Sequence, residues 1–450
     1  MARAAKKETA LTAEEKLAQA LVPEAEQPYQ VERNWCWSKF SSVIELISGR
    51  DAALSDCNDE GIGIPYILGA SNLDNNSFAV ERWIEKPQVV AEKGDILLSV
   101  KGTIGKLYIQ QEDKINLSRQ IMAIRSSSVV NKHYVYMFLT SICEELREEG
   151  SGLIPGISRQ DILNRAFPLP PLAEQQRIVD RIESLFAKLD EAKEKAQAVV
   201  DGFEDRKAAI LHKAFTGELT AEWRKRNSVS IKEWRKKNLG AFSFVTKLAG
   251  FEYTKNIAPN LVESGIPLFK GKNVQQGKLV LEFESFIPKE VSDELPRSQL
   301  KKKCLLTPYV GTIGNIAIFD GSFEAHLGSN VGKIEIESET FEEFLLYYLR
   351  SDLGYKELTK AKKATAQESI SIQAIRNVEV LLPTLAEQQE IVSILDRFIG
   401  QEEQAKETAE QVIDQIDIMK KAILARAFRG ELGTNDPTDE SAEELLKRVL

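Results

Sequence analysis

The sequence has few of the side chains that bind metal ions or form disulfide bonds. Its 450 residues include four cysteines and three histidines, and no two of these seven lie close together along the chain. They are Cys36, Cys57, Cys143, Cys304, His133, His212 and His326. Zinc sites and disulfide frameworks require clustered ligands, so the sequence predicts neither, and we expect the histidines to be packing or surface residues.

Long apolar runs are also lacking. Runs such as "VLLP", which ends at Pro383, fall far short of the roughly 20 residues that cross a bilayer, and the first 30 residues are charged rather than apolar. A composition of 43% apolar and 28% charged residues is typical of a soluble globular protein. We therefore expect a cytoplasmic protein with no membrane association and with roughly two to four domains.

Catalytic motifs are the third absence. The sequence contains no GxxxxGK[ST] phosphate loop, no HExxH, no glycine-rich cofactor turn, and no "NPP[YF]" of the kind that adenine methyltransferases carry. "KGTIG" at Lys101 to Gly105 resembles the GxxG loop of an RNA-binding module, but its place between two strand-like runs favours a hairpin turn. The sequence therefore predicts a protein that binds and positions, while other proteins carry out the chemistry.

Positive charge is in deficit as well. The formal net charge is −9, which argues against a nucleic-acid binder that acts alone. Contact with DNA would have to come from local patches or be shared with a basic partner. One such patch is Glu222 to Lys237, which has seven Lys or Arg against two Glu. It is either a solvated linker or a contact for phosphates or a partner.

What the sequence does contain is a long internal repeat. "PLAEQQRIV" begins at Pro171 and "TLAEQQEIV" begins at Thr384, 213 positions later. At this constant offset, 22 of 48 positions from Leu172 and from Leu385 are identical without a gap, and both copies end in "AFxGEL". Because loops tolerate insertions, a match of constant length suggests that the length itself is constrained.

Each copy of the repeat has the 4,3 apolar spacing of a coiled-coil seam. The predicted seam residues are Ile178, Ile182, Leu185, Leu189, Ala192, Ala196, Val199, Phe203, Arg206 and Ile210 in the first copy, and Ile391, Leu395, Phe398, Glu402, Ala405, Ala409, Val412, Ile416, Met419 and Ile423 in the second. Each copy starts after proline and ends at Gly217 or Gly430, so we expect two helices of about 45 residues. They either pack on their own domains or pair with each other, and the matched seams favour antiparallel pairing.

The segments that precede the two helices are weaker copies of each other. "VKGTIGKLYI" at Val100 corresponds to "YVGTIGNIAI" at Tyr309, and "YVYMFLTS" at Tyr134 corresponds to "FLLYYLRS" at Phe344. Short apolar runs broken by glycine predict strands, and the tyrosine-rich run predicts a helix, so each segment reads as a mixed α/β domain. Framework-like pieces agree while the residues between them diverge, which predicts two related but different ligands.

Two variable α/β domains, each followed by a helix that opens with "LAEQQ" and closes with "AFxGEL", resemble the specificity subunit of a Type I restriction-modification system. The resemblance extends from Trp35 to Leu432 and includes the "GELTAEWR" continuation and the C-terminal "DESAEELLKRVL". It implies an α+β fold in which two target recognition domains are separated by a long antiparallel two-helix coiled coil, with a pseudo-two-fold internal repeat. The expected divisions are an N-terminal arm (1–33), target recognition domain 1 (34–169), a central conserved helix (170–219), a linker (220–238), target recognition domain 2 (239–382), a C-terminal conserved helix (383–432) and a tail (433–450).

The resemblance also implies a non-catalytic function. Each recognition domain would bind half of a split sequence in double-stranded DNA, and the helices would act as a ruler between the halves. Two methyltransferase subunits would supply S-adenosylmethionine, restriction and translocase subunits would supply ATP and Mg, and this chain would bind no cofactor directly. We further expect the N-terminal arm and the tail to lie together and imitate the linker, which would give the second methyltransferase subunit an equivalent docking site.

Base-reading side chains must be donors and acceptors on exposed loops, whereas Lys and Arg hold phosphates. On position alone, the candidate DNA-binding residues are Lys101, Thr103, Ser118, Arg119, Gln120, Arg159 and Gln160 in the first domain, and Lys270, Lys272, Asn273, Asn315, Ser329 and Asn330 in the second. Glu174 and Glu387 of the repeated phrase are interpreted as carboxylates near the positive end of a helix rather than as catalytic groups. The alternatives are a duplicated coiled-coil adaptor for protein partners, and a stand-alone methyltransferase or nuclease, against which the missing motifs argue.

Overall fold

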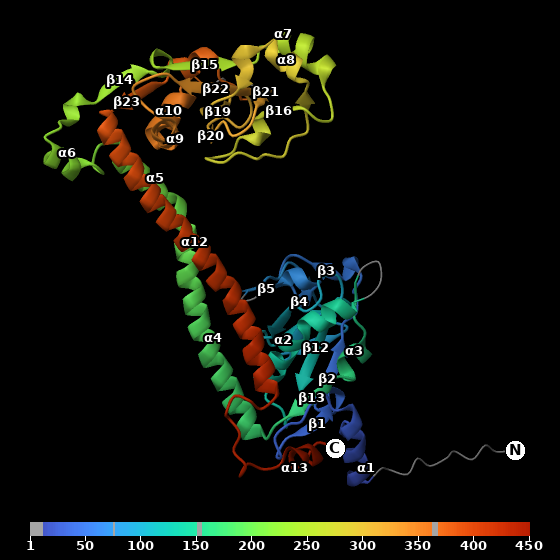
Figure 1. Ribbon diagram of the computed structural model, residues 1–450. Helices are drawn as coiled ribbons and strands as arrows, with labels where there is room; N and C mark the ends of the chain where they lie inside the picture. Colours follow the sequence, from blue (N-terminus) through green and yellow to red (C-terminus); the bar gives the residue numbers. More distant parts are fainter. Residues whose placement is uncertain (1–11, 75–76, 151–154, 362–367) are drawn as a thin grey trace. The chain divides into compact units, whose positions relative to one another are not determined.

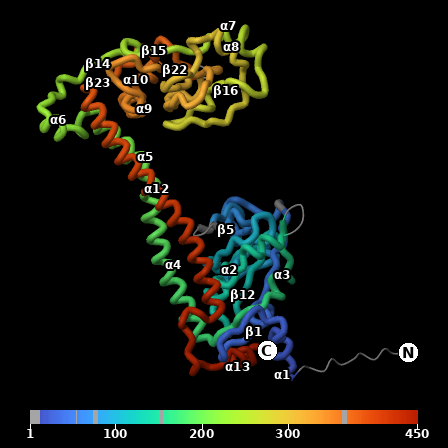
Figure 2. The backbone as a smooth tube through the Cα atoms, viewed as in Figure 1, coloured from blue at the N-terminus to red at the C-terminus, as the bar shows by residue number. Residues whose placement is uncertain are grey.

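The computed structural model describes residues 12–74, 77–150, 155–361 and 368–450. The chain divides into two compact units, and both combine short strands with helices (Figures 1 and 2). Unit 1 comprises Met1–Lys195 and Val412–Leu450, and unit 2 comprises Ala196–Gln411. In the part of the chain that is described, no helix is long and apolar enough to span a membrane.

Unit 1 contains thirteen of the strands in the described residues. They are β1 (Cys36–Lys39), β2 (Ile44–Ser48), β3 (Cys57–Asn58), β4 (Ile64–Ile67), β5 (Leu73–Asp74), β6 (Ser77–Phe78), β7 (Trp83–Ile84), β8 (Val90–Glu92), β9 (Ile96–Ser99), β10 (Leu107–Ile109), β11 (Lys114–Leu117), β12 (Ile121–Ser126) and β13 (Ala166–Leu169). A four-stranded sheet has the order β10-β9-β12-β2, a five-stranded sheet has the order β3-β7-β4-β11-β8, and β1 pairs with β13. Within the five-stranded sheet, β4 and β11 run parallel.

Unit 2 repeats this arrangement. Its strands are β14 (Arg235–Asn238), β15 (Ser243–Lys247), β16 (Ile266–Phe269), β17 (Phe286–Ile287), β18 (Gln299–Leu300), β19 (Cys304–Pro308), β20 (Ala317–Phe319), β21 (Ala325–Leu327), β22 (Val331–Ile336) and β23 (Glu379–Leu382). The order β15-β22-β19-β20 corresponds to β2-β12-β9-β10, and the parallel pair β16 and β21 corresponds to β4 and β11. Two strands flanking each domain also pair in both units, β1 with β13 and β14 with β23. The duplication seen in the sequence is therefore a duplication of the fold.

The helices complete both units. They are α1 (Ala13–Ala20), α2 (Lys132–Glu149), α3 (Arg159–Leu163), α4 (Leu172–Asp201), α5 (Phe203–Phe215), α6 (Ala221–Asn227), α7 (Gly250–Glu252), α8 (Lys289–Asp293), α9 (Glu342–Arg350), α10 (Asp352–Thr359), α11 (Ile372–Arg376), α12 (Leu385–Phe428) and α13 (Ala442–Lys447). The helix predicted for the tyrosine-rich run is α2, and its counterpart in unit 2 is divided into α9 and α10 at Ser351. The predicted hairpin turn at "KGTIG" is confirmed, because it connects the antiparallel strands β9 and β10.

The two long helices differ in continuity. The second is one helix of 44 residues, α12, but the first is divided into α4 and α5 at Gly202, so the prediction of a continuous first helix is wrong at one residue. Glycine is a poor helix former because it loses much backbone entropy on folding. The guanidinium of Arg206 donates a hydrogen bond of 2.8 Å to the carbonyl of Val199 and so satisfies an acceptor next to the break.

The paired segments run antiparallel within each unit. In unit 1, Lys193 of α4 pairs with Asp417 of α12 at 2.7 Å, and Lys420 pairs with Asp190, so the partner number falls as the residue number rises. In unit 2, the Nε of Arg206 donates to Glu402 at 2.7 Å and Lys406 lies over the Phe203 ring, so the partner number again falls as the residue number rises. Arg206 and Glu402 are the two polar members of the predicted seams, and they form an ion pair with each other. The predicted antiparallel pairing is thus confirmed in each unit.

Part of the predicted seam is wrong. Ala192 and Ala405 are exposed, and so are Val412 and Met419 at 40% and 43%. The residues that directly follow these four in the sequence are half-buried instead, and they are Lys193, Lys406, Ile413 and Lys420. Lysine can occupy such positions because its aliphatic stem packs on apolar surface while the ammonium group reaches a partner. Lys406 lies 5.1 Å from the centre of the Phe203 ring, and Lys420 lies 5.0 Å from that of Phe186.

The arm and the tail meet in unit 1, as the sequence predicts for residues from Thr12 onward. Helices α1 and α13 are in contact, and the side chain of Lys16 donates to the carbonyl of Leu450 (Figure 2). The backbone N–H of Ala442 donates to the carbonyl of Asn34 at 2.9 Å. Ala20, Leu445 and Phe428 belong to the same buried apolar cluster as the domain's own strands. The first eleven residues of the arm lie outside the described residues.

Candidate nucleic-acid interface

Five loops of unit 1 converge at one edge of its sheets. Ser118, which follows β11, donates from its N–H to Ile67 O at 2.9 Å and from its hydroxyl to Leu68 O at 2.5 Å, which joins it to the loop after β4. Val100 N–H donates to Gln120 O at 2.9 Å, and Lys101 forms a β-bridge with Gly156. Chain segments that are distant in sequence are therefore held together by backbone hydrogen bonds.

A fifth loop, after β2, completes this edge. The backbone N–H of Arg119 donates to Oδ1 of Asp51 at 3.1 Å, and the guanidinium Nε lies 2.8 Å from Oδ2 of the same carboxylate. Arg159, the first residue of α3, donates to the hydroxyl of Ser48 at 2.7 Å. We define the domain 1 edge as residues 48–51, 68–69, 100–103, 118–120 and 156–160.

All seven candidate residues of the first domain lie on this edge. Lys101 is half-buried, and Ser118 is 2% exposed, so the Ser118 hydroxyl fixes the loop rather than facing solvent. The exposed candidates are Thr103, Arg119, Gln120, Arg159 and Gln160. The structure thus brings together residues that the sequence spreads over sixty positions. Their contact with DNA remains a prediction.

The second domain has an equivalent edge. Gly328 N–H donates to Phe269 O at 2.8 Å, Tyr309 N–H donates to Asn330 O at 3.0 Å, and Val310 forms a β-bridge with Ser369. The ammonium group of Lys247 lies 4.4 Å from the centre of the Tyr309 ring. We define the domain 2 edge as residues 247–249, 269–273, 309–315, 328–330 and 368–370.

The six candidates of the second domain differ in what they can offer a ligand. Asn273 is 2% exposed, and its side chain accepts from Lys270 N–H at 2.9 Å and donates to Val280 O at 2.9 Å, so it holds its own turn. Asn315 is half-buried and donates to Val274 O at 3.0 Å. The side chain of Lys270 donates to Ser285 at 2.7 Å, and exposed Lys272 pairs with Glu284. Ser329 and Asn330 are half-buried, and no contact of either side chain is recorded among the described residues.

Sequence reasoning missed three residues of these edges, Asp51, Lys247 and Tyr309. Asp51 holds Arg119, and Lys247 lies over Tyr309, so both contribute charge at the edge. The signal was present, because the loops after β2 and β15 flank the repeated strands. The two loops are not similar in sequence, however. Only the strand order shows that they lie beside residues 118–120 and 328–330.

A second kind of site lies where each long helix begins. In unit 1, the carboxylate of Glu174 is fully buried and accepts from Trp35 Nε1 at 2.7 Å, Asn435 Nδ2 at 2.8 Å and Thr434 Oγ1 at 3.3 Å. Burial raises the pKa of Glu174, and the hydrogen bonds from Trp35, Asn435 and Thr434 partly oppose this. Trp35 is itself 5% exposed and belongs to the buried core of unit 1.

Unit 2 has the corresponding junction at Glu387. Its buried carboxylate accepts from Arg224 at 2.6 Å, from the Thr220 hydroxyl at 2.8 Å and from Trp234 Nε1 at 2.9 Å. Arg224 is 8% exposed, so this member of the basic stretch Glu222–Lys237 is a core residue. The neighbouring Lys225, Arg226, Arg235 and Lys236 are exposed. Both glutamates are therefore structural junctions that start a helix, with buried partners that the sequence interpretation did not foresee.

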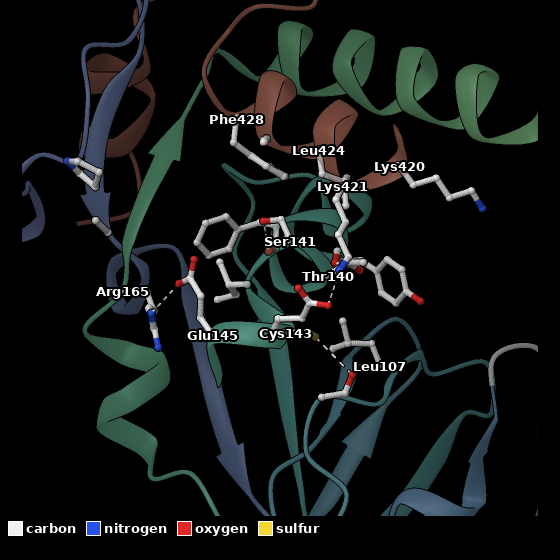
Figure 3. A pocket seen from close by; sticks show the side chains of 18 of the residues that line it. Leu107, Thr140, Ser141, Cys143, Glu145, Arg165, Lys420, Lys421, Leu424 and Phe428 are labelled. Atoms are coloured by element: carbon white, nitrogen blue, oxygen red, sulfur yellow. Dashed lines mark hydrogen bonds and ion pairs between the residues drawn. The ribbon is translucent and has the colours of Figure 1, made fainter. Parts of the chain in front are cut away.

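A pocket of about 1060 Å³ lies beside α2 in unit 1 (Figure 3). Among its charged side chains, Arg165 pairs with Glu145 and Lys421 pairs with Glu144. The thiol of Cys143 donates to Gly105 O, and burial raises its pKa to about 11. A thiol must ionise to act as a nucleophile, so the Cys143 thiol is not activated in this pocket.

The other buried thiols and the histidines are packing or surface groups in the described residues. Burial raises the pKa of Cys36 and of Cys304 to about 12, and burial lowers the pKa of His326, which is fully buried in the core of domain 2. His133 and His212 are exposed. In the described ranges, no group of three or more His, Cys, Asp or Glu could hold a metal ion.

Comparison with known proteins defines the class of protein that this duplicated fold belongs to. The family model described as "Type I restriction modification DNA specificity domain" matches the chain twice, at residues 32–200 and 232–414. The chain therefore belongs to this family of Type I restriction-modification specificity proteins, as its sequence motifs predict. It is accordingly the non-catalytic component, which recognises DNA.

Particular relatives agree over nearly the full length. The specificity subunit of the Type I restriction enzyme EcoBI from Escherichia coli is 22% identical over 419 residues, which cover 89% of this chain and 86% of the relative. The crystal structure of the HsdS subunit from Thermoanaerobacter tengcongensis has a TM-score of 0.63 at 20% identity and covers 91% of this chain and 100% of the other. A chain from a structural study of complex assembly and conformational transition of the type I R-M system has a TM-score of 0.69 at 18% identity, with coverages of 90% and 100%. The predicted α+β fold class, with its internal repeat, is confirmed.

Proposed function

We propose that the chain reads a bipartite target in double-stranded DNA, one part with the edge of each domain. The observation that carries this proposal is the pair of equivalent edges, built on the same strand order but presenting different polar side chains. Two copies of one framework with different surface chemistry are what a protein needs to read two different short sequences. Thr103, Arg119, Gln120, Arg159 and Gln160 are the proposed contacts of domain 1.

The proposed contacts of domain 2 are Lys272, Ser329 and Asn330, with Lys270 near them. Lys101 and Lys270 would hold phosphates, whereas buried Ser118, Asn273 and Asn315 would keep the loops in shape. Half or more of the hydrogen bonds in protein–DNA complexes go to phosphates and sugars, and these position the protein without reading sequence. A chain with a net charge of −9 has little positive charge to spare for this, so partners would supply part of it.

The partners in this proposal are two methyltransferase subunits, which bring S-adenosylmethionine, and restriction and translocase subunits, which bring ATP and Mg. Support for two equivalent docking sites comes from the two junctions. A tryptophan and a threonine meet the buried glutamate in both units, Trp35 and Thr434 in unit 1 and Trp234 and Thr220 in unit 2. The tail, together with Trp35 just after the arm, thus builds in unit 1 what the linker builds in unit 2, as expected if each supports one methyltransferase subunit.

Duplex binding tests the proposal. The full chain, alone and co-purified with its methyltransferase subunit, is titrated onto a pool of random duplexes at several salt concentrations. We expect the complex to select a split sequence, with affinity that falls steeply as salt rises. A complex that selects no sequence would sink the proposal and leave the protein-binding adaptor as the better interpretation.

The long helices set the spacing between the two half-sites in this proposal. Inserting seven residues into both helices, near Ala196 and Ala409, adds two turns to each and preserves the seam. At 1.5 Å per residue this adds about 10 Å, or about three base pairs at 3.4 Å each. Adenine methylation mapped by direct sequencing should show a longer spacer with unchanged half-sites, and an unchanged spacer would contradict the ruler.

A further inference from the structure

Residues 118–120 and 328–330 occupy the same place in the two domains. Each segment follows the strand that pairs in parallel with β4 or with β16. In each, the first residue donates its N–H to the end of that partner strand, Ser118 to Ile67 and Gly328 to Phe269. In each, the third residue accepts from the strand before the "GTIG" turn, Gln120 from Val100 and Asn330 from Tyr309. Arg119 therefore corresponds to Ser329, and Gln120 corresponds to Asn330.

The backbone beneath residues 118–120 is held on several sides. Arg50 N–H donates to Leu117 O at 2.9 Å, and Gly49 N–H donates to Ile121 O at 3.1 Å. A Cβ on Gly49 would lie 2.0 Å from Ser118 O, so the two backbones touch and only glycine fits there. Side chains on such a support need little ordering when a ligand binds.

Several other positions of the edge are identical in the two domains or are polar in only one of them. The "GTIG" turns are identical, and their glycines share left-handed φ values of 77° and 86° in domain 1 and 86° and 97° in domain 2. Gln160 corresponds to Gln373. Lys101 and Arg159 correspond to Val310 and Ile372, which have no polar side-chain atoms to offer a base. The pairs 119/329 and 120/330 are different and polar in both domains. Ser48 and Lys247 also correspond and differ, but the Ser48 hydroxyl accepts from Arg159 and the Lys247 ammonium lies over the Tyr309 ring.

The chemistry of these pairs suits base recognition. The Arg119 side chain is 65% exposed, and Asp51 fixes it through both the backbone N–H and Nε, which leaves the two terminal nitrogens of the guanidinium outside that contact. A guanidinium fork matches O6 and N7 of guanine, and the amide of Gln or Asn matches N6 and N7 of adenine. Ser329 and Asn330 are shorter, and Asn330 has a left-handed φ of 66°, which asparagine tolerates better than most residues.

From this equivalence we infer that Arg119-Gln120 and Ser329-Asn330 are the paired specificity determinants of the two domains. They read base edges in the major groove of the two half-sites, and their difference makes the half-sites different. Asp51 acts as a positioning residue that aims Arg119. This inference rests on the proposed function and goes beyond it by assigning base choice to two residues in each domain.

The test uses the full chain with its methyltransferase subunit and selection from random duplexes. The double variant Arg119→Ser with Gln120→Asn gives domain 1 the residues of domain 2. We expect altered base preference in one half-site and an unchanged sequence in the other. An unchanged preference, a change in both halves or the loss of all sequence selection would overturn the inference, because each means that these residues do not set base choice in one half alone.

Two single variants separate base reading from simple charge. Arg119→Lys keeps the charge but loses the fork, so discrimination at one base pair should fall about ten-fold or more while the salt dependence stays. Arg159→Ser removes a charge from the start of α3 on the same edge, and it should weaken binding to all sequences equally and reduce the salt slope by about 1. If Arg119→Lys behaves like Arg159→Ser, Arg119 holds a phosphate and the inference is wrong.

The outcomes also distinguish the inference from the proposed function. A wild-type complex that selects no split sequence removes the proposed function. If the wild-type complex does select a split sequence but the variants leave that selection unchanged, only the assignment of residues 119–120 and 329–330 is removed.

Discussion

The two buried glutamates differ in the charge of the groups that donate hydrogen bonds to them. Glu387 accepts from Arg224, whose side chain is 10% exposed, whereas the direct donors to Glu174 are the neutral groups of Trp35, Asn435 and Thr434. Glu387→Gln leaves the Arg224 guanidinium buried without its carboxylate. Removing one partner of a buried ion pair costs about 3–5 kcal/mol. Arg224 keeps hydrogen bonds to Thr220 and Gly217, so we expect a cost near the lower limit, about 3 kcal/mol.

Glu174→Gln should cost less. A glutamine keeps one acceptor oxygen for Trp35 or Asn435 and leaves no buried cation behind, so the expected loss is about 1 kcal/mol, the worth of one ordinary hydrogen bond. The assay is hydrogen exchange of the full chain, read by segment. Protection of residues 220–238 should fall about 100-fold in Glu387→Gln, and protection of 32–39 and 434–446 about five-fold in Glu174→Gln.

A surface carboxylate of unit 2 supplies the control. Glu379, 49% exposed, lies 3.9 Å from Lys236, and Glu379→Gln should change protection by less than about 0.5 kcal/mol in free-energy terms. Equal losses for Glu174→Gln and Glu387→Gln, or a larger loss for Glu174→Gln, would refute the argument that the buried guanidinium decides the difference.

The other predictions concern pH, glycine geometry and thiol reactivity. Because the pKa of Glu174 is raised above its ordinary value of 4.5 in the folded chain, ionisation opposes folding, so its contribution to stability is full below pH 4.5 and is lost as pH rises through the folded pKa. Exchange protection of unit 1 in the wild type, relative to Glu174→Gln, should therefore fall as pH rises from about 4 upward, and a rise would contradict the assigned cause. A Cβ on Gly314 would lie 2.3 Å from the Tyr355 ring, whereas one on Gly102 meets nothing within 4 Å, and both glycines have left-handed φ. Gly314→Ala should thus destabilise by about 1 kcal/mol more than Gly102→Ala in chemical unfolding, and equal effects would show that the ring moves freely. In the native protein a maleimide should label half-exposed Cys57 first, while buried Cys36, Cys143 and Cys304 react only on unfolding, as mass spectrometry after timed labelling can check.

The sequence alone predicted the architecture because the signals for it are periodic. The repeat at Leu172 and Leu385, the hairpin at "KGTIG" and the helix at Lys132 all appear where the pattern puts them. The seam was predicted only in part, since a 4,3 count does not say whether Ala192 or Lys193 faces the partner. Lys193 occupies the half-buried position because its aliphatic stem packs on apolar surface and its ammonium group pairs with Asp417.

The candidate edges were predicted less completely, for a different reason. Position along the chain identified Arg119, Gln120 and Asn330 as polar residues near strand ends. It could not place them beside Asp51 or Lys247, because that depends on the strand order. Nor could it separate Ser118 and Asn273, which hydrogen-bond to their own backbone, from neighbours that face solvent. The distinction between a loop's support and its exposed side chains needs three-dimensional contacts.

The division of the chain sets an order of events during synthesis. Unit 2 is one continuous stretch, Ala196–Gln411, whereas unit 1 needs residues from both ends of the chain. Leu424, Phe428 and Leu446 belong to the core of unit 1, and Thr434 and Asn435 complete the Glu174 junction. A nascent chain can therefore finish its second domain while the first, made earlier, still lacks Val412–Leu450. Until then the first domain exposes apolar surface, so we expect chaperones to bind this domain. We also expect a premature stop codon to prevent this domain from folding.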